Sequence, residues 1–201
     1  MKTDVIMISG DGRRTERALQ QAEKVIAYKE LKGKNALHLR LLTEEMMGMM
    51  RSITGETEGK FWIEDQDGEF QIHLRVVTRM DSGKRDRLLA VSSSGRNESA
   101  RGLMGKIRDF FDRSADDDLA AYSGALMLPE MYDYSTAVTP ELEWSMMEYE
   151  NALSGRLKNH EAGAEEAWDE LEKSVVAHVA DDVKVYIREG VVEMVIFKKM
   201  A

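Results

Sequence analysis

The sequence predicts a single α/β domain, and three observations favour this fold class. Apolar residues recur at helical spacing near the N-terminus, and they alternate with polar residues at a period of two in two later stretches. Hydrophobic residues make up 43% of the 201 residues and charged residues 32%, which is the balance of a globular protein. A chain of this length can bury about 70% of its unfolded surface without disulfides or metals.

The N-terminal quarter of the chain predicts a strand followed by two helices. Residues 4–9 are typical of a short buried strand, and Gly10-Asp11-Gly12 ends it. The first helix ends near Gly33, and the second runs from an Asn35 N-cap to Ile53. Apolar residues lie on nearly every side of the second helix, which predicts deep burial. The positions at helical spacing are Ala18, Ala22, Val25 and Ile26 in the first helix and Leu39, Leu42, Met46, Met49 and Ile53 in the second.

Two later stretches alternate apolar and polar residues and therefore predict antiparallel hairpins. In the stretch 61–76, the residues Asp65-Gln66-Asp67-Gly68 supply the chemistry of a turn. In the stretch 183–196, the turn falls at Glu189-Gly190.

The region between the two hairpins is less regular. We expect a short helix over 85–90, a polar loop over 92–99 and then a helix that carries Leu103, Ile107, Phe110 and Phe111. Residues 114–138 are expected to form a connector.

Two more helices are predicted before the terminal hairpin. Thr139-Pro140 is a good helix start, and the helix that follows would turn Trp144, Met147 and Leu153 inward. Residues 164–180 predict one further helix, with Ala167, Leu171, Val175, His178 and Val179 at helical spacing. We expect one domain over 1–201, with 114–159 as a lid-like or inserted segment.

Charge and composition exclude several classes of protein. The absence of cysteine excludes disulfides and thiolate-bound zinc, and it favours a reducing compartment. The apolar run at 5–8 is too short for a signal peptide or a membrane span, so we expect a cytoplasmic protein with no membrane partner. The net charge of −9 argues against nucleic acid as a partner.

One segment departs from this acidic balance. Residues 79–113 contain nine basic and five acidic residues, a net charge of +4. A cationic lid over phosphate groups would have this composition, and so would an ordinary solvated face, which is the commoner origin.

Three short motifs are candidates for a ligand site. Glu44 and Gly48 are one helical turn apart on the second predicted helix. Asp81-Ser82-Gly83 follows the first hairpin, where a plain strand-to-helix turn is the alternative interpretation. Gly102-Leu103-Met104-Gly105-Lys106 offers exposed backbone N–H groups at a helix start, or equally a close helix packing.

The order of elements, together with these motifs, resembles the GHKL (histidine-kinase-like) ATPase superfamily, and in particular its bacterial anti-sigma-factor serine-kinase branch. Such domains pack helices on one face of a mixed, largely antiparallel sheet, and they bind ATP between the helices and a mobile lid. The resemblance covers roughly residues 4–198, and the segment 114–159 is the part it accounts for least.

The resemblance implies a role for each motif. Glu44 matches the glutamate that acts as general base in active members, and Gly48 stands where the family has a magnesium-binding asparagine. Asp81 and Gly83 match part of the adenine-binding motif. Gly102, Gly105 and Lys106 resemble the glycine-rich stretch beneath the phosphates. Because glycine has no side chain to ligate a metal, magnesium binding and phosphoryl transfer are both put in question.

Glu44 also has a purely structural interpretation. A carboxylate on a strongly apolar helix must be paired or functional, but Glu44 could instead lie on an exposed rim opposite Arg40 or Arg51.

The sequence gives less support to a metal site or a hydrolase active site. The four histidines, His38, His73, His160 and His178, show no metal-ligand spacing with acids or with one another. The serine run 92–94 has no nucleophile motif around it, so a hydrolase triad is unsupported.

Three functions remain open on these grounds. The first is an ATP- or ADP-binding regulatory domain, a pseudoenzyme with weak or absent catalysis and a protein partner or a homodimer. The second is a protein-interaction module on the same fold that binds no nucleotide. The third is an active serine kinase or ATPase whose metal site has been rebuilt from residues such as Glu45 or Asp81.

Overall fold

The computed structural model describes residues 1–9, 15–54, 58–77, 107, 142–188 and 191–200, whose strands form one six-stranded sheet. The strand order across the sheet is β1-β2-β3-β6-β5-β4. In chain order the elements are β1 (Ile6–Ser9), α1 (Thr15–Tyr28), α2 (Lys34–Thr54), β2 (Glu58–Gln66), β3 (Glu69–Val77), β4 (Leu142–Ser145), α5 (Met146–Lys158), α6 (Ala164–Glu172), α7 (Val175–Val179), β5 (Asp182–Arg188) and β6 (Val191–Lys199).

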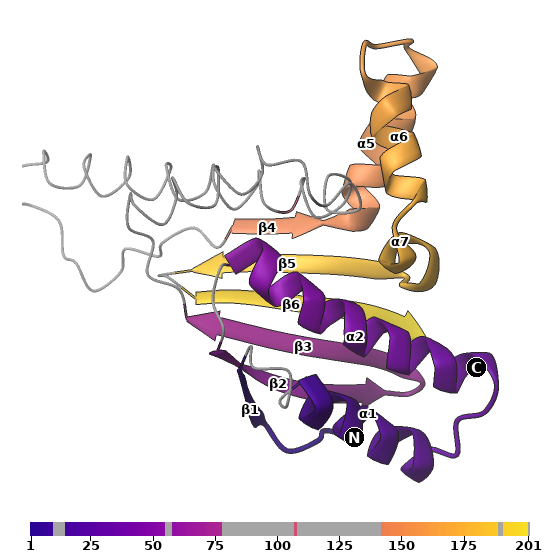
Figure 1. Cartoon of the computed structure of the whole chain (residues 1–201). Coiled ribbons are helices and arrows are strands. Elements are labelled where there is room, and N and C mark those ends of the chain that lie inside the picture. Colours follow the sequence, from indigo (N-terminus) through magenta and orange to yellow (C-terminus); the bar gives the residue numbers. More distant parts are fainter. Residues whose placement is uncertain (10–14, 55–57, 78–106, 108–141, 189–190, 201) are drawn as a thin grey trace, which may run out of the picture.

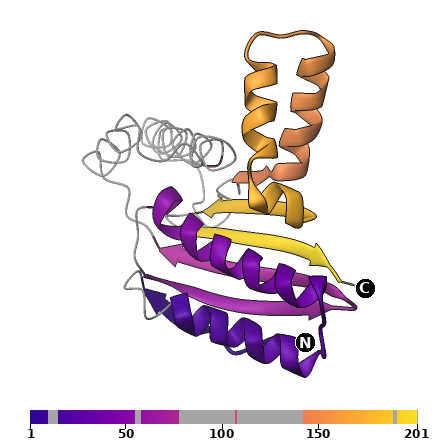
Figure 2. The same cartoon turned by 45° about the vertical axis from the view of Figure 1, so that its right-hand side comes forward.

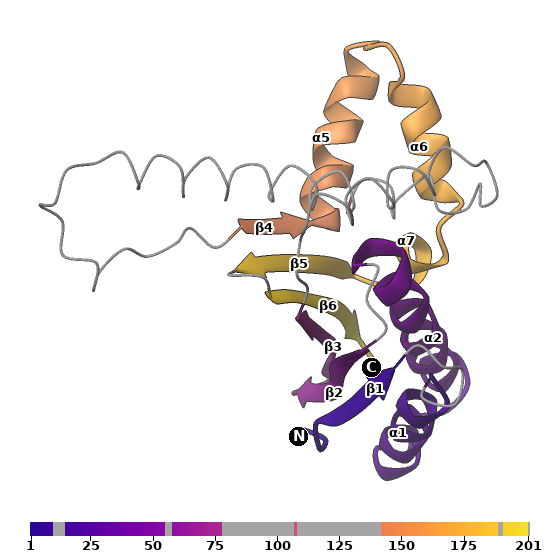
Figure 3. The same ribbon diagram turned by 60° about the vertical axis from the view of Figure 1, so that its left-hand side comes forward.

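The helices α1 and α2 lie across one face of the sheet (Figure 1). Turning the molecule shows α5 and α6 rising side by side beyond the β4 edge (Figure 2). When the sheet is viewed closer to its edge, α1, α2 and α7 all lie on the same side of the strands (Figure 3). The predicted α/β class, a two-layer α+β sandwich, is confirmed. The resemblance implies a mixed sheet, whereas each pairing among the described strands is antiparallel.

The core lies between the sheet and these helices. It is formed by the alternating apolar residues of the strands and by the apolar residues at helical spacing in the helices. Alternate residues of β2, β3 and β6 point to the helices, and residues at helical spacing on α1 and α2 point back. Each large side chain buried in this way contributes about 1.5–3 kcal/mol. The fully buried members include Ala18, Ala22, Leu39, Leu42, Met46, Met49, Phe61, Ile63, Ile72, Leu74, Met194 and Ile196.

Both predicted hairpins are present. The turn between β2 and β3 consists of Asp67 and Gly68, whose φ angles are 53° and 88°. Two successive positive φ angles are the requirement of the turns that match strand twist, and Asp-Gly meets it at low cost. The Asp65 carboxylate accepts a hydrogen bond from the Gly68 backbone N–H at 3.0 Å, which fixes the turn further.

Asp65 also ties this turn to α1. The Lys29 ammonium at the end of α1 lies 2.5 Å from the Asp65 carboxylate. Burial of Asp65 would raise the pKa of its carboxyl group, but the hydrogen bonds from Lys29 and Gly68 outweigh burial and lower it. The ion pair therefore helps to hold the first helix against the end of the hairpin.

The prediction of one helix over 164–180 is wrong, because the structure breaks it into α6 and α7. The chain leaves the helix at Lys173, and Ser174 then adopts an extended conformation. Its hydroxyl accepts a hydrogen bond from the Ala177 backbone N–H, which starts α7. An interior serine that caps a new helix competes with continuation of the old one.

A second correction concerns the segment before α5. Trp144, predicted to lie on a helix, belongs instead to the edge strand β4, which pairs with β5. The helix begins only after Ser145, whose hydroxyl accepts from the Glu148 backbone N–H. Met147, predicted to face inward, is 51% exposed, whereas Leu153 is buried as expected.

Several predicted features lie outside the described residues. These are the helix over 85–90, the loop 92–99, the connector 114–138 and the helix start at Thr139-Pro140. Of the helix predicted to carry Leu103 and Phe110, only Ile107 is described, and it is buried. Among the helices that the structure describes, none has the length and apolarity to cross a membrane.

Candidate functional site

Helix α2 turns Glu44 and Gly48 away from the sheet. Leu42 and Met46 on the opposite side are fully buried, while Glu44 and Gly48 are exposed. A Cβ atom added to Gly48 would meet no atom of the described residues within 4 Å, so these residues leave the space above this position open. The prediction that α2 is buried on nearly every side is therefore wrong for this face, where Leu37 is also 50% exposed. We call the exposed stripe of α2 around Glu44 and Gly48 the open face of α2.

One of the two cations expected opposite Glu44 is engaged elsewhere. The Arg40 guanidinium pairs with Glu23 of α1, with a distance of 2.6 Å between Arg40 Nε and Glu23 Oε1. This pair joins the two helices and leaves Arg40 committed to α1. The side chain of Arg51 lies outside the described residues.

Glu45 is the neighbouring acid on the same helix and lies closer to the protein interior. Partial burial raises the pKa of its carboxyl group, and the nearby negative charge of Glu44 raises it further. The two carboxylates therefore differ in environment, Glu44 in solvent and Glu45 half-buried.

The other predicted ligand-binding residues cannot be placed against this face. Asp81, Gly83, Gly102, Gly105 and Lys106 all lie outside the described residues. The structure thus describes one wall of the predicted nucleotide site, and the convergence of the motifs on one cavity stays a prediction.

The described residues of the open face do not fit a magnesium site. Gly48 offers no side-chain oxygen, and Mg²⁺ requires near-octahedral oxygen coordination. Within the described ranges, no group of three or more histidine and carboxylate side chains is arranged to hold a metal ion. A rebuilt metal site on α2 would have Glu44 and Glu45 as its only nearby acidic side chains on that helix.

The opposite face of the sheet carries a polar cluster that the sequence analysis missed. The Trp62 and His73 rings, opposite each other on β2 and β3, stack with centroids 4.6 Å apart and planes 8° from parallel. His73 Nδ1 lies 3.3 Å from a carboxylate oxygen of Glu193 on β6, and His73 Nε2 lies 3.9 Å from Glu64.

Cations and donors surround the two carboxylates of this cluster. The hydrogen bond to His73 and the bonds from Arg75, at 2.9 and 2.6 Å, hold the pKa of Glu193 below its usual value. The Lys2 ammonium does the same for Glu64, with help from the Trp62 indole N–H. These side chains bind one another across the sheet surface, except that the buried His73 Nε2 makes no hydrogen bond among the described residues.

The only sequence signal for this cluster is the alternation of the first hairpin. Once the register is set, Trp62 and His73 must share the polar face. Glu193 is 120 residues from His73 in the sequence, and only the pairing of β3 with β6 brings the two together.

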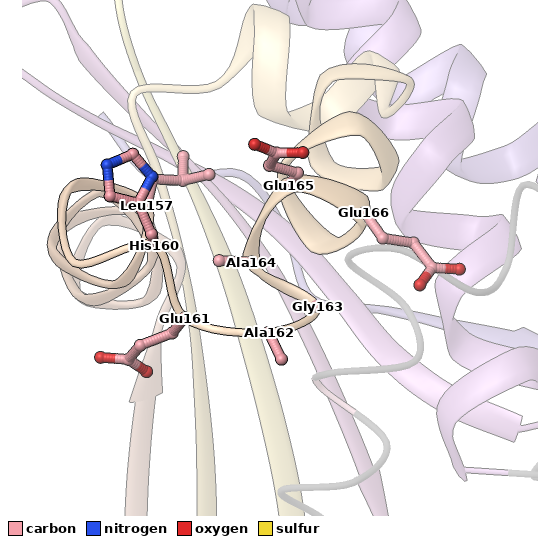
Figure 4. Close-up of a pocket in the computed structure, with 8 residues that line it drawn as sticks. All are labelled: Leu157, His160, Glu161, Ala162, Gly163, Ala164, Glu165 and Glu166. Atoms are coloured by element: carbon pink, nitrogen blue, oxygen red, sulfur yellow. The ribbon is translucent and has the colours of Figure 1, made fainter.

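A hollow of about 370 Å³ lies at the tip of the α5–α6 hairpin. It is lined by the end of α5, by the connecting turn and by the first turn of α6 (Figure 4). The Glu165 side chain lies across the turn from Leu157 and His160, while Glu161 and Glu166 project outward on opposite sides (Figure 4). This acidic lining is unsuited to a nucleotide phosphate, so the hollow is not a substitute for the predicted ATP site.

Comparison with known proteins found no match. No protein-family model matches the chain, and neither a curated protein nor a solved structure matches it.

Proposed function

We propose that this chain is a cytoplasmic, nucleotide-binding regulatory domain that resembles histidine-kinase-like ATPases and turns over ATP slowly or not at all. The observation that carries the proposal is the open face of α2. Glu44 and Gly48 stand one turn apart on the same exposed side of that helix. Among the described residues, no atom lies within 4 Å of a Cβ built on Gly48, so this part of the chain leaves room for a ligand close to the helix.

The order of elements supports the same proposal. Strand, two helices and a hairpin lead to a final hairpin whose last strand, β6, pairs with β3. Helices α1 and α2 cover one face, as the resemblance implies (Figure 1). The segment 78–141, which contains the remaining predicted ligand residues, connects β3 with the edge strand β4.

The chemistry of α2 favours binding over catalysis. A general base at Glu44 would serve an active enzyme, but phosphoryl transfer also needs a metal or other cations against the phosphates. Position 48 supplies no side-chain ligand for a metal, so α2 lacks a group that phosphoryl transfer needs, whereas binding of a nucleotide can use other contacts. We therefore expect the affinity for a nucleotide to come from direct contacts with the protein and not from a metal ion that α2 holds against the phosphates.

Thermal unfolding with ATP or ADP, each with and without magnesium, tests this function. A ligand present at a hundred times its dissociation constant adds about 2.7 kcal/mol to the free energy of unfolding, which raises the melting temperature measurably. Stabilisation without magnesium is the expected result.

Two other results would overturn the proposal in different directions. Stabilisation that requires magnesium would indicate a rebuilt metal site and an active kinase or ATPase. No shift at millimolar ATP would remove nucleotide binding and leave the nucleotide-free interaction module.

A further inference from the structure

Helix α6 concentrates negative charge on the projecting hairpin. Five of its nine residues are acidic and none is basic. Among the described residues, none of these carboxylates forms an ion pair, and the carboxylate of Glu172 accepts a hydrogen bond from the Trp168 indole N–H at 2.8 Å. The acidic residues of the helix are Glu165, Glu166, Asp169, Glu170 and Glu172.

Helix stability explains the position of only some of these acidic residues. Glu165 and Glu166 lie in the first turn, where the helix dipole favours acids. Glu170 and Glu172 lie in the last turn, where the same dipole disfavours them. Glu166 and Glu170 are also four residues apart, so their like charges repel each other.

Several acids on the sheet or directly beside it are placed differently. Glu64, Asp65, Glu143, Asp181 and Glu193 each lie within 3.0 Å of a lysine or arginine nitrogen. Most carboxylates of the sheet therefore have a cation beside them, whereas the carboxylates of α6 have none among the described residues.

The hollow at the tip adds a shaped pocket to this charged surface. Leu157 and Ala164 give it apolar walls, and Glu165 and Glu166 lie at its edge. A lysine or arginine side chain has an apolar stem and a cationic end, which match these two kinds of wall. Glu161 is already paired with Arg156 at 3.0 Å, so the carboxylates left for such a side chain are those of α6.

We propose that the acidic side of the α5–α6 hairpin is a docking surface for a lysine- or arginine-rich segment of a partner protein, one of whose basic side chains occupies the hollow at the tip. Among the described elements, the α5–α6 hairpin projects away from the sheet and from α2 in every view (Figures 1, 2 and 3). Charge complementarity selects this occupant and excludes nucleic acid. The proposal goes beyond nucleotide binding and does not depend on it.

The test uses the full chain and a short fluorescein-labelled peptide of alternating arginine and alanine, followed by fluorescence anisotropy at low ionic strength. A peptide with glutamine in place of arginine is the ligand control. We expect the arginine peptide to bind and the glutamine peptide not to bind. We also expect the triple variant Glu165→Gln/Glu166→Gln/Asp169→Asn to weaken binding about tenfold or more, which corresponds to about 1.4 kcal/mol.

A matched triple variant removes the same charge elsewhere. Glu16→Gln/Glu30→Gln/Glu58→Gln changes three exposed acids that lie outside the hairpin, and it should leave affinity for the arginine peptide nearly unchanged. Equal loss in both triple variants would show attraction by net charge alone and would overturn the docking surface. Absence of binding to the unmodified chain would overturn it as well.

A variant without a charge change tests the hollow itself. Ala162 lines the hollow and is exposed, so Ala162→Trp should fill the space and leave the fold intact. We expect this variant to weaken peptide binding several-fold while its circular dichroism and melting temperature stay close to those of the unmodified chain. Unchanged affinity in Ala162→Trp would contradict occupation of the hollow by a basic side chain.

Discussion

The sheet with its covering helices and the α5–α6 hairpin are built on different principles. In the sheet, apolar side chains fill the space under α1 and α2, and many of the charged groups at the surface are paired across strands. The hairpin buries few side chains, Met146 and Leu153 on α5 and Ala164 and Leu171 on α6, and keeps most of its acids in solvent. Substitutions in the sheet should therefore lower the free energy of unfolding, whereas substitutions on the surface of the hairpin should change it little.

The largest expected effect is a cavity in the centre of the sheet. Leu74 on β3 is completely buried between the sheet and the helices. Leu74→Ala should lower the free energy of unfolding by about 2–5 kcal/mol, because the variant loses the buried contacts of the leucine side chain and keeps a cavity in their place. Urea unfolding measures this change, and Leu37→Ala, at a 50% exposed position, is the control. A cost for Leu74→Ala as small as that of the control would contradict the position of the core.

A pair of glycines sharpens the comparison. A Cβ on Gly59 of β2 would lie 3.1 Å from the Arg75 carbonyl oxygen and 3.2 Å from side chains on β3, whereas a Cβ on Gly155 of α5 would meet nothing within 4 Å. Gly59→Ala should therefore destabilise the protein by about 1–3 kcal/mol. Gly155→Ala should stabilise it by about 0.5–1 kcal/mol, since alanine favours a helix. Melting curves that move in the same direction for both variants would refute this contrast.

The paired carboxylates of the sheet make stability depend on pH. The His73 and Arg75 bonds lower the pKa of Glu193 in the folded state, so its stabilising contribution is present above the unfolded pKa of about 4.3. This contribution disappears as the pH falls through the folded pKa. Glu193→Gln should cost about 1 kcal/mol at neutral pH, and the difference should shrink towards pH 3.

Denaturant unfolding of both proteins between pH 7 and pH 3 measures this effect. Glu58→Gln, at an exposed position on β2, is the matched control. A Glu193→Gln difference that stays constant over the whole pH range would show that the charge of Glu193 is not the source of its contribution.

The smallest expected effect lies on the hairpin. Glu170→Lys replaces a repulsion with Glu166 by an attraction and places a cation in the last turn of α6. It should stabilise the protein by about 0.3–0.5 kcal/mol at low salt, and added salt should reduce the gain. A loss of stability would indicate that Glu170 has a partner that the described residues do not show.

Regular periodicity made most of the fold predictable from sequence. The alternation in 61–76 and 183–196 and the Asp67-Gly68 turn lead directly to the two hairpins, and the helical spacing of Ala18, Ala22 and Val25 leads to α1. The errors fall where local signals compete. Ser145 and Ser174 each cap a new helix, and neither cap changes the apolar pattern on which the predictions relied.

The candidate site was less predictable for two physical reasons. Spacing showed that Glu44 and Gly48 share one face of α2, but an all-round apolar helix gave no sign of which face is exposed. The cluster around His73 depends on a contact between β3 and β6, and no local pattern specifies which distant strands become neighbours.

Calorimetric titration of ATP into the unmodified chain, Gly48→Leu and Gly155→Leu tests the central claim most directly. Both positions are helical glycines at which an added Cβ meets no atom of the described part of the chain within 4 Å, so both variants should fold. Nucleotide binding on the open face of α2 predicts that the unmodified chain and Gly155→Leu bind ATP, and that Gly48→Leu does not. Equal heats of binding for all three proteins, or no binding to any of them, would contradict the claim.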